Sequence, residues 1–261
     1  VALGYNALTA FTTGGWNTVL GTNAGDSVTS GEKNVFMGYK AGQAISTQSN
    51  SVLIGYEAGN VAQVTGTTGI GYRVFVDLTD GAENTAIGYE AGSNITTGDR
   101  NIAIGYQAKA GTVGYDNIVL GKGAGAGFSS GYKNIVMGNQ AAAGHNGIEN
   151  VVIGHQANGG GSTSVDKTII IGYQAGYSIN SADADGTVVI GYKAGVSITS
   201  GQYNVAIGYE AGKSNLISNE NTYIGYQAGY GQLGTDSYGG STFIGYKAGY
   251  STSDSGFQRS V

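Results

Sequence analysis

Aliphatic residues recur in a short alternating pattern along the whole chain. In each repeat a β-branched residue, one further residue and a second aliphatic residue precede a glycine, as in residues 205–208, Val-Ala-Ile-Gly. Apolar residues that alternate with a period of two are typical of a β-strand with one buried face. The pattern predicts a short strand before each of these glycines, with the aliphatic residue next to the glycine buried.

The spacing of these glycines predicts how the strands are arranged. Successive glycines lie 16 to 20 residues apart, most often 17. A fixed short period is typical of solenoids, in which each repeat packs only against its neighbours. We therefore expect an all-β, rod-like β-solenoid of about 15 coils of about 17 residues over residues 1–249, and an irregular tail over 250–261. The glycines are Gly4, Gly21, Gly38, Gly55, Gly71, Gly88, Gly105, Gly121, Gly138, Gly154, Gly172, Gly191, Gly208, Gly225 and Gly245.

The residues around each strand refine the picture of one coil. Asparagine precedes the strand in nine repeats, and serine or threonine precedes it in five. These short side chains suit a turn and, stacked coil on coil, could form an amide ladder. Alanine stands three residues after the glycine in fourteen repeats, which indicates a tight contact. Each coil is expected to contain, in order, a strand, a corner at the glycine, a second short strand and a polar loop, and no helix. The glycine itself is expected to let the backbone turn, bulge or approach another strand closely.

Composition narrows the function classes. Glycine accounts for 49 of 261 residues and proline is absent, which suits a chain of stacked strands better than a disordered one. The net charge of −5 argues against a nucleic-acid partner, which requires basic surfaces. There is no cysteine, and no apolar run approaches the ~18 residues of a membrane helix, so we expect neither disulfides nor membrane insertion.

A single coil has too few inward apolar residues to be a self-sufficient cylinder. Each repeat supplies about four or five such residues, and several of them are alanine. This shortage favours association, with neighbouring chains completing a shared core. A homotrimer is the arrangement that we expect.

Two phrases in the repeats resemble known families. Residues 84–88, 101–105 and 204–208 follow the pattern Asn-x-Ala-Ile-Gly, similar to the Asn-Ser-Val-Ala-Ile-Gly repeats of trimeric autotransporter adhesin heads. The resemblance implies a trimeric left-handed parallel β-roll, although the period of 17 is longer than in those heads. The phrase Ile-Gly-Tyr-Gln-Ala-Gly-Tyr at 171–177 and 224–230 is more similar to glycine/tyrosine repeats of bacteriophage tail fibres. That resemblance implies a virion location, with the bacterial cell surface as the alternative.

Tyrosine follows the glycine in eleven repeats, which predicts a row of rings along the solenoid. Such a row is either a structural ladder between coils or chains, or a strip that stacks on sugar rings; we favour the ladder. The residues are Tyr5, Tyr39, Tyr56, Tyr72, Tyr89, Tyr106, Tyr173, Tyr192, Tyr209, Tyr226 and Tyr246.

The places where the period fails are the candidate contacts with a receptor. Lengthened loops fall at 159–164, 180–186 and 231–240, and insertions in solenoids often line a binding face. The unit at Gly71 also departs from the pattern, because Val74-Phe75 replaces Ala-Gly; this indicates a surface patch or a shifted corner. The candidate contact residues in the loops are Asn180, Asp183, Asp185, Asp236 and Tyr238.

Three sequence features could carry chemistry, and each has a plainer interpretation that we favour. Residues 181–186 resemble half of a calcium loop but lack the distal glutamate, so an enlarged surface turn is expected. His145 and His155 lack a metal-ligand spacing, so no metal or cofactor is expected. A third feature is the glutamates that recur two residues after the glycine; they could pair as in glycosidases, but they alternate with Lys, Gln and Arg as on a solvated face. These are Glu57, Glu90 and Glu210.

Together these features predict a non-enzymatic fibre segment for host or surface attachment. The favoured form is the shaft or receptor-reaching part of a phage tail fibre, and the alternative is a bacterial trimeric adhesin head. Its partner would be a cell-surface polysaccharide or a protein receptor. A fibre-borne polysaccharide depolymerase is a weaker alternative because no irregular segment is long enough to build an acidic cleft. An ice-binding solenoid would need flat Thr-x-Thr rows, which the chain lacks.

Overall fold

The computed structural model describes residues 1–61, 65–144, 146–160, 164–231 and 239–250. Over these ranges the chain forms fifteen short parallel strands, one in each coil, and almost no helix. The predicted all-β solenoid with about 17 residues per coil is confirmed. The chain divides into two compact units, Val1–Tyr132 and Lys133–Val261.

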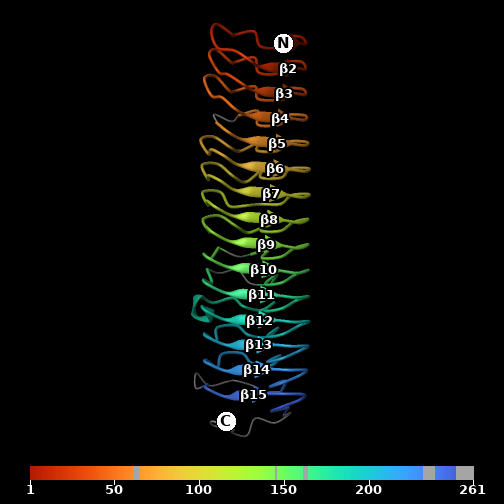
Figure 1. The fold of residues 1–261 in the computed structure, drawn as a ribbon, viewed down its shortest axis with the longest axis vertical. Helices are drawn as coiled ribbons and strands as arrows, with labels where there is room; N and C mark the ends of the chain where they lie inside the picture. The colour runs from red at the N-terminus through yellow and green to blue at the C-terminus, as the bar shows by residue number, and fades with distance from the viewer. Residues whose placement is uncertain (62–64, 145, 161–163, 232–238, 251–261) are drawn as a thin grey trace. The chain divides into compact units, whose positions relative to one another are not determined.

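Within each unit, every strand pairs in parallel with the next strand of the chain (Figure 1). The register places equivalent residues side by side, as in the pairing of Phe36 with Leu53 and of Val189 with Ala206. The first unit contains β1 (Ala2–Leu3), β2 (Thr18–Leu20), β3 (Val35–Met37), β4 (Val52–Ile54), β5 (Thr68–Ile70), β6 (Thr85–Ile87), β7 (Ile102–Ile104) and β8 (Ile118–Leu120). The second unit contains β9 (Ile135–Met137), β10 (Val151–Ile153), β11 (Ile169–Ile171), β12 (Val188–Ile190), β13 (Val205–Ile207), β14 (Thr222–Ile224) and β15 (Thr242–Ile244).

Two details of the predicted coil are wrong. The residues after the glycine form turns instead of a second short strand, because the residue two positions after it adopts a left-handed conformation, as at Glu90 with φ of 50°. A single turn of 3₁₀ helix, η1 (Ala182–Ala184), also occurs in a lengthened loop, where no helix was expected. The Ser181 side chain caps it by accepting a hydrogen bond from the Asp183 N–H.

The burial of the strand residues is the reverse of the prediction. In β2 to β15 the middle residue points into the coil, whereas the residues on either side of it point outward. Ala103 is fully buried, for example, while the neighbouring Ile104 is 37% exposed. Alternation fixes which residues share a face but not which face is inside. The expectation that the aliphatic residue before each glycine is buried is therefore wrong.

Three positions of each regular coil fill its interior. They are the middle strand residue, the alanine after the glycine and an apolar residue further on, as with Phe36, Ala41 and Ile45. All three of these side chains are completely buried. The predicted tight alanine contact is confirmed, since the repeated alanines in regular coils are also completely buried, as at Ala91 and Ala194.

The glycine that ends each strand lies against the next coil. At Gly88, φ is +135°, a conformation that residues with a Cβ rarely adopt. A Cβ at this position would also lie 2.6 Å from the Gly105 carbonyl oxygen. The predicted close approach of two backbones is confirmed, and it explains why no other residue occupies this position in the repeats.

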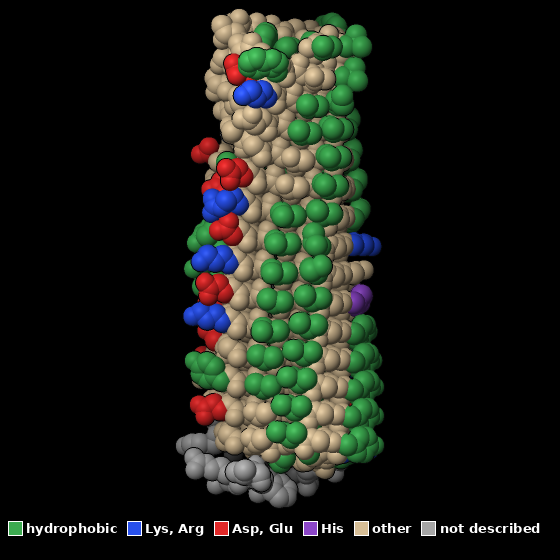
Figure 2. Space-filling view, viewed as in Figure 1, with side chains coloured by type: hydrophobic (Ala, Val, Ile, Leu, Met, Phe, Trp, Pro, Cys, Tyr) green, Lys and Arg blue, Asp and Glu red, His purple; other side chains and the backbone are tan. Residues whose placement is uncertain are grey.

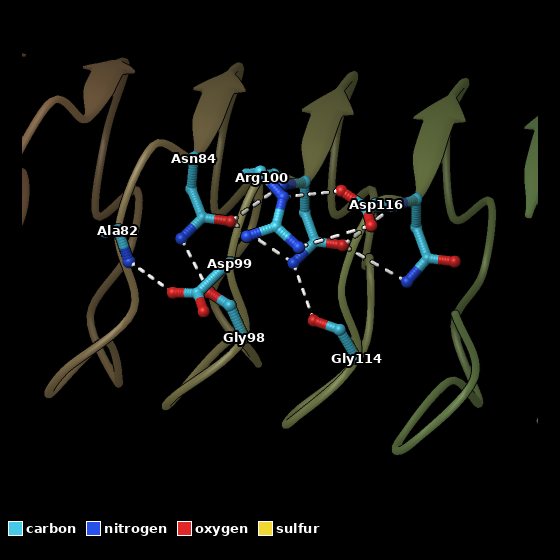
Figure 3. Close-up of polar contacts among 9 residues, drawn as sticks. Ala82, Asn84, Gly98, Asp99, Arg100, Gly114 and Asp116 are labelled. Atoms are coloured by element: carbon cyan, nitrogen blue, oxygen red, sulfur yellow. Dashed lines mark hydrogen bonds and ion pairs between the residues drawn. The ribbon is translucent and has the colours of Figure 1, made fainter. Parts of the chain in front are cut away.

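The asparagines before the strands form the expected amide ladder inside the coils (Figure 3). The Asn101 Nδ2 donates to the Gly114 carbonyl oxygen at 2.7 Å, and the Asn101 Oδ1 accepts from the Asn117 N–H at 3.0 Å. Asn101 also donates to the Asn84 Oδ1 at 3.2 Å. Because the side chain is fully buried, these partners replace water for backbone groups of adjacent coils.

Replacing Asn101 by alanine is expected to lower the free energy of unfolding by about 3 kcal/mol, because a buried N–H and a buried carbonyl oxygen each lose a partner. Threonine occupies the equivalent position at Thr187, where its hydroxyl donates to the Gly201 carbonyl oxygen at 3.1 Å. Asn101→Thr is therefore the control and is expected to lose about half as much. Urea denaturation followed by circular dichroism measures both. Equal stability of Asn101→Ala and wild type would contradict the role of the ladder.

The irregular unit at Gly71 compensates for a missing core side chain. The middle residue of β5 is Gly69, and both Val74 and Phe75 of the same coil are completely buried. A Cβ on Gly69 would lie 3.0 Å from the Phe75 ring and 2.9 Å from Val74. Phe75 thus fills the space that a strand residue fills elsewhere, and the expected surface patch is instead part of the core.

Candidate functional site: the outer surfaces of the coils

The outward residues of the strands form an apolar surface, which we call the strand face. In the first unit it consists of the first and third residues of β2 to β8, and in the second unit of those of β9 to β15. Every one of these positions is Thr, Val, Ile, Leu or Met. Its aliphatic side chains form green columns across the coils, whereas its threonines are drawn in tan (Figure 2). Several aliphatic side chains are substantially exposed, including Ile135 and Met137 at 37% each. No charged residue interrupts the strand face.

In each unit the strand face is comparable in area to the largest apolar patch of an ordinary monomer. Strands lie ~4.8 Å apart and a strip two side chains wide measures roughly 10 Å across, so seven strands present roughly 300 Å² in each unit. Ordinary monomers expose a largest apolar patch of about 300–600 Å², and such patches are often functional. Each unit therefore carries a continuous candidate interaction surface. The alternation of the strand residues predicts the aliphatic residue before each glycine inside the coil, so it does not reveal this surface.

The tyrosines that follow the glycines stack ring on ring, and we call them the tyrosine row. In the first unit consecutive rings from Tyr39 to Tyr106 lie 5.0–5.3 Å apart between centroids. In the second unit the rings from Tyr173 to Tyr246 lie 5.0–5.3 Å apart, and His155 stacks on Tyr173 at 5.4 Å. Each unit thus has one stack of the row, and the two stacks contain five tyrosines each, ten of the eleven named from the sequence. Tyr5 is not among them, because the equivalent residue of the next coil is Thr22.

Stacking decides which part of each ring faces solvent. A tyrosine inside the row has another ring on each face, so its edge and hydroxyl account for its exposure of 40–45%. A sugar ring stacks on the face of an aromatic side chain, and these faces are covered. Partial burial, followed by the charge of Glu90, raises the pKa of Tyr89 above its usual value, and the charge of Glu57 is the main cause of the same shift at Tyr56.

The carboxylates two positions after the glycines are each paired with polar groups of adjacent coils or turns. Arg73 lies between Glu57 and Glu90, at 3.6 Å and 3.9 Å, and the Gln107 side chain donates to Glu90 at 2.8 Å. In the second unit Lys213 donates to Glu210 at 2.7 Å. Partial burial raises the pKa of Glu210, but hydrogen bonds from Lys213 and Gln227 outweigh it and hold that pKa below its usual value. These glutamates thus form part of a charged surface row, and a cation separates Glu57 from Glu90.

The described loop residues named from the sequence make hydrogen bonds within the loop and to adjacent coils. Asp185 accepts a hydrogen bond from the Asp166 N–H at 2.8 Å, which ties two coils together. The Asn180 N–H donates to the Thr199 carbonyl oxygen, and the Asp183 carboxylate accepts from the Ser181 hydroxyl at 3.1 Å. Asp236, Tyr238 and His145 lie outside the described residues. In the ranges that the structure describes, no group of three or more His, Cys, Asp or Glu side chains could hold a metal ion.

No family model, no curated protein and no solved structure matches the chain. Among the described residues, no helix is long and apolar enough to cross a membrane.

Proposed function

We propose that this chain is a non-enzymatic structural segment of an attachment fibre, assembled as a homotrimer through the strand face. The observation that carries the proposal is the uncharged strand face, which a single chain leaves in water. Burying about 300 Å² of apolar surface per unit stabilises an assembly by roughly 7 kcal/mol for each unit of each chain before the costs of association.

A second copy of the same chain fits the strand face better than an unrelated partner. The face repeats once per coil with a fixed spacing of ~4.8 Å between strands, and only a surface with the same repeat matches it along its length. Three strand faces turned toward a common axis would bury one another. The tyrosine row and the paired glutamates would then stay on the outside of the assembly.

The likeness of the repeats to phage tail-fibre and adhesin-head sequences supports attachment as the purpose of such a fibre. A tail fibre in the virion is the favoured setting, and an adhesin head on the bacterial surface is the alternative. The ion pairs of Glu57, Glu90 and Glu210 support a structural role for these carboxylates over a catalytic one. The receptor would be a polysaccharide or a protein of the cell surface.

Charge on the strand face tests the assembly. The double variant Ile135→Glu and Met137→Glu is expected to convert the trimer to a monomer, because glutamates at a buried interface would be desolvated without partners. Asn139→Glu with Gln140→Glu adds two charges to the same coil at exposed positions outside the strand face, and it is expected to remain trimeric. Sedimentation equilibrium gives the mass of each species. A monomeric wild type, or an equal effect of both double variants, would contradict the proposal.

Attachment itself is tested by incubating the purified trimer with bacterial cells and with their isolated surface polysaccharides. We expect retention on cells, competition by one of the two surface components and no change in polysaccharide chain length. Shortening of the polysaccharide would overturn the non-enzymatic assignment. A trimer that binds no cells would retain the assembly but remove the attachment role.

A further inference from the structure

The tyrosine row has a chemical consequence that does not depend on the proposed fibre. We propose that the tyrosine row is a site of oxidative cross-linking, at which a one-electron oxidant such as a peroxidase with hydrogen peroxide joins tyrosines of adjacent coils as dityrosine. Three observations carry this assignment: the spacing of the rings, their exposure to solvent and the absence of cysteine from the sequence.

The spacing holds potential partners together before any oxidation occurs. Tyr72, Tyr89 and Tyr106 are successive rings with centroids 5.0 Å and 5.1 Å apart, and their planes differ by only 11° and 8°. The second unit repeats this arrangement at Tyr192 and Tyr209, 5.0 Å apart. Two radicals formed on neighbouring rings therefore meet without diffusion of the chains, whereas free tyrosines would have to collide.

Exposure allows both access and rearrangement. Tyr89 is 43% exposed and Tyr106 is 47% exposed, so an oxidant or its small mediator reaches the ring edges. Coupling requires two stacked rings to tilt until an ortho carbon of one touches an ortho carbon of the other, and the exposed ring edges leave solvent on one side for this movement. Fully packed rings could not make that movement.

The reaction balances with peroxide as the oxidant. Each of two phenols loses one electron and one proton to give a tyrosyl radical, whose unpaired electron is shared between the oxygen and the Cε carbons. A carbon–carbon bond forms between one Cε of each ring, and each of these carbons then loses its hydrogen while its oxygen regains a proton. Hydrogen peroxide accepts the two electrons and two protons and becomes two molecules of water.

The composition of the chain directs oxidation to these rings. The sequence contains 19 tyrosines but no cysteine, two methionines and one tryptophan. No thiol can therefore quench the radicals or form a disulfide instead. Each dityrosine would close a loop of about one coil, so cross-linking fastens adjacent coils of a unit to one another and limits their separation on unfolding.

The experiment treats the full chain with horseradish peroxidase and hydrogen peroxide, followed by tryptic digestion and mass spectrometry. Cleavage after Arg73 and Arg100 places Tyr72, Tyr89 and Tyr106 on three different peptides, so the Tyr72–Tyr89 and Tyr89–Tyr106 cross-links join different pairs of peptides and differ in mass. We expect joined peptides that have lost two hydrogens, the blue fluorescence of dityrosine and a yield per chain that is independent of protein concentration.

Two single variants provide the matched comparison. Tyr89→Phe leaves a ring in place but removes its phenol. Because each tyrosine joins one neighbour, the five stacked tyrosines of the first unit form at most two cross-links. Without a phenol at position 89, Tyr106 has no neighbour to join and the remaining three form at most one, so the yield is expected to halve. Tyr5→Phe removes a tyrosine that also follows a glycine but has no ring in the equivalent place of the next coil, and it is expected to change nothing. Cross-links as frequent at Tyr5 as in the row, or a yield that rises with protein concentration, would overturn the proposal. Oxidised tyrosines without any joined peptides in the wild-type digest would also overturn it.

Discussion

Replacement of Gly88 by alanine is expected to lower the free energy of unfolding by about 3 kcal/mol or more. Two effects add at this position. The backbone holds φ at +135°, which strains any residue with a Cβ, and the new methyl group would lie 2.6 Å from the Gly105 carbonyl oxygen of the next coil. Relief would require two paired coils to separate, which would also lengthen the hydrogen bonds that cross between them. Thermal and urea denaturation of the purified variant measure the loss.

Gly245→Ala separates the two effects. Gly245 has a similar φ of +125°, but a Cβ there would meet no atom of the described residues within 4 Å. Only the backbone strain remains, so the expected loss is about 1–2 kcal/mol. If both variants lose the same stability, the close approach of the coils contributes nothing and the glycine is required for its conformation alone.

Substitutions at Gly69 and Phe75 are expected to cause the second large change in the free energy of unfolding. Phe75→Gly is expected to cost about 3–5 kcal/mol because it leaves a cavity where a fully buried ring stood. Gly69→Phe alone is expected to cost about 1–3 kcal/mol or more through overpacking, because a Cβ on Gly69 already meets Val74 and Phe75 at 2.9–3.0 Å.

The double variant Gly69→Phe with Phe75→Gly is expected to recover most of the lost stability. The ring then leaves the strand as it does at Phe36, which lies over Gly42 of its own coil. The coupling between the two sites is read from the double-mutant cycle in urea denaturation. Losses that simply add would show that Phe75 does not fill the space above Gly69, and the compensation described for this coil would be wrong.

The sequence was sufficient to predict the architecture because each coil repeats the same local constraints. The glycine spacing predicted the number of coils, and the asparagines predicted the amide ladder that the structure shows at Asn84 and Asn101. The inward face of the strands could not be predicted correctly. In some coils the inward residue is only an alanine, as at Ala86 and Ala103. The larger isoleucine that follows it is the residue expected to be buried, which predicts the opposite orientation of the strand.

The candidate surfaces were only partly predictable for the same reason. The tyrosine row follows directly from the period, because equivalent residues of adjacent coils lie side by side in any in-register solenoid. The strand face depends on orientation, which a period of two residues leaves open. The role of Phe75 depends on the space that Gly69 leaves inside the coil. The shape of that space is set by the folded coil, and the local sequence does not show it.

The in-register pairing of the strands has a consequence for how this gene can change. Residue Phe36 lies beside Leu53, and Val189 lies beside Ala206, so the residue that limits a substitution is found about one repeat away in the chain. Related sequences should therefore show covariation concentrated at an offset of about 17 positions, parallel to the diagonal of a contact map. Unequal recombination that removes or duplicates a whole repeat would keep this offset intact, and it should be tolerated far better than the loss of a single residue within a strand.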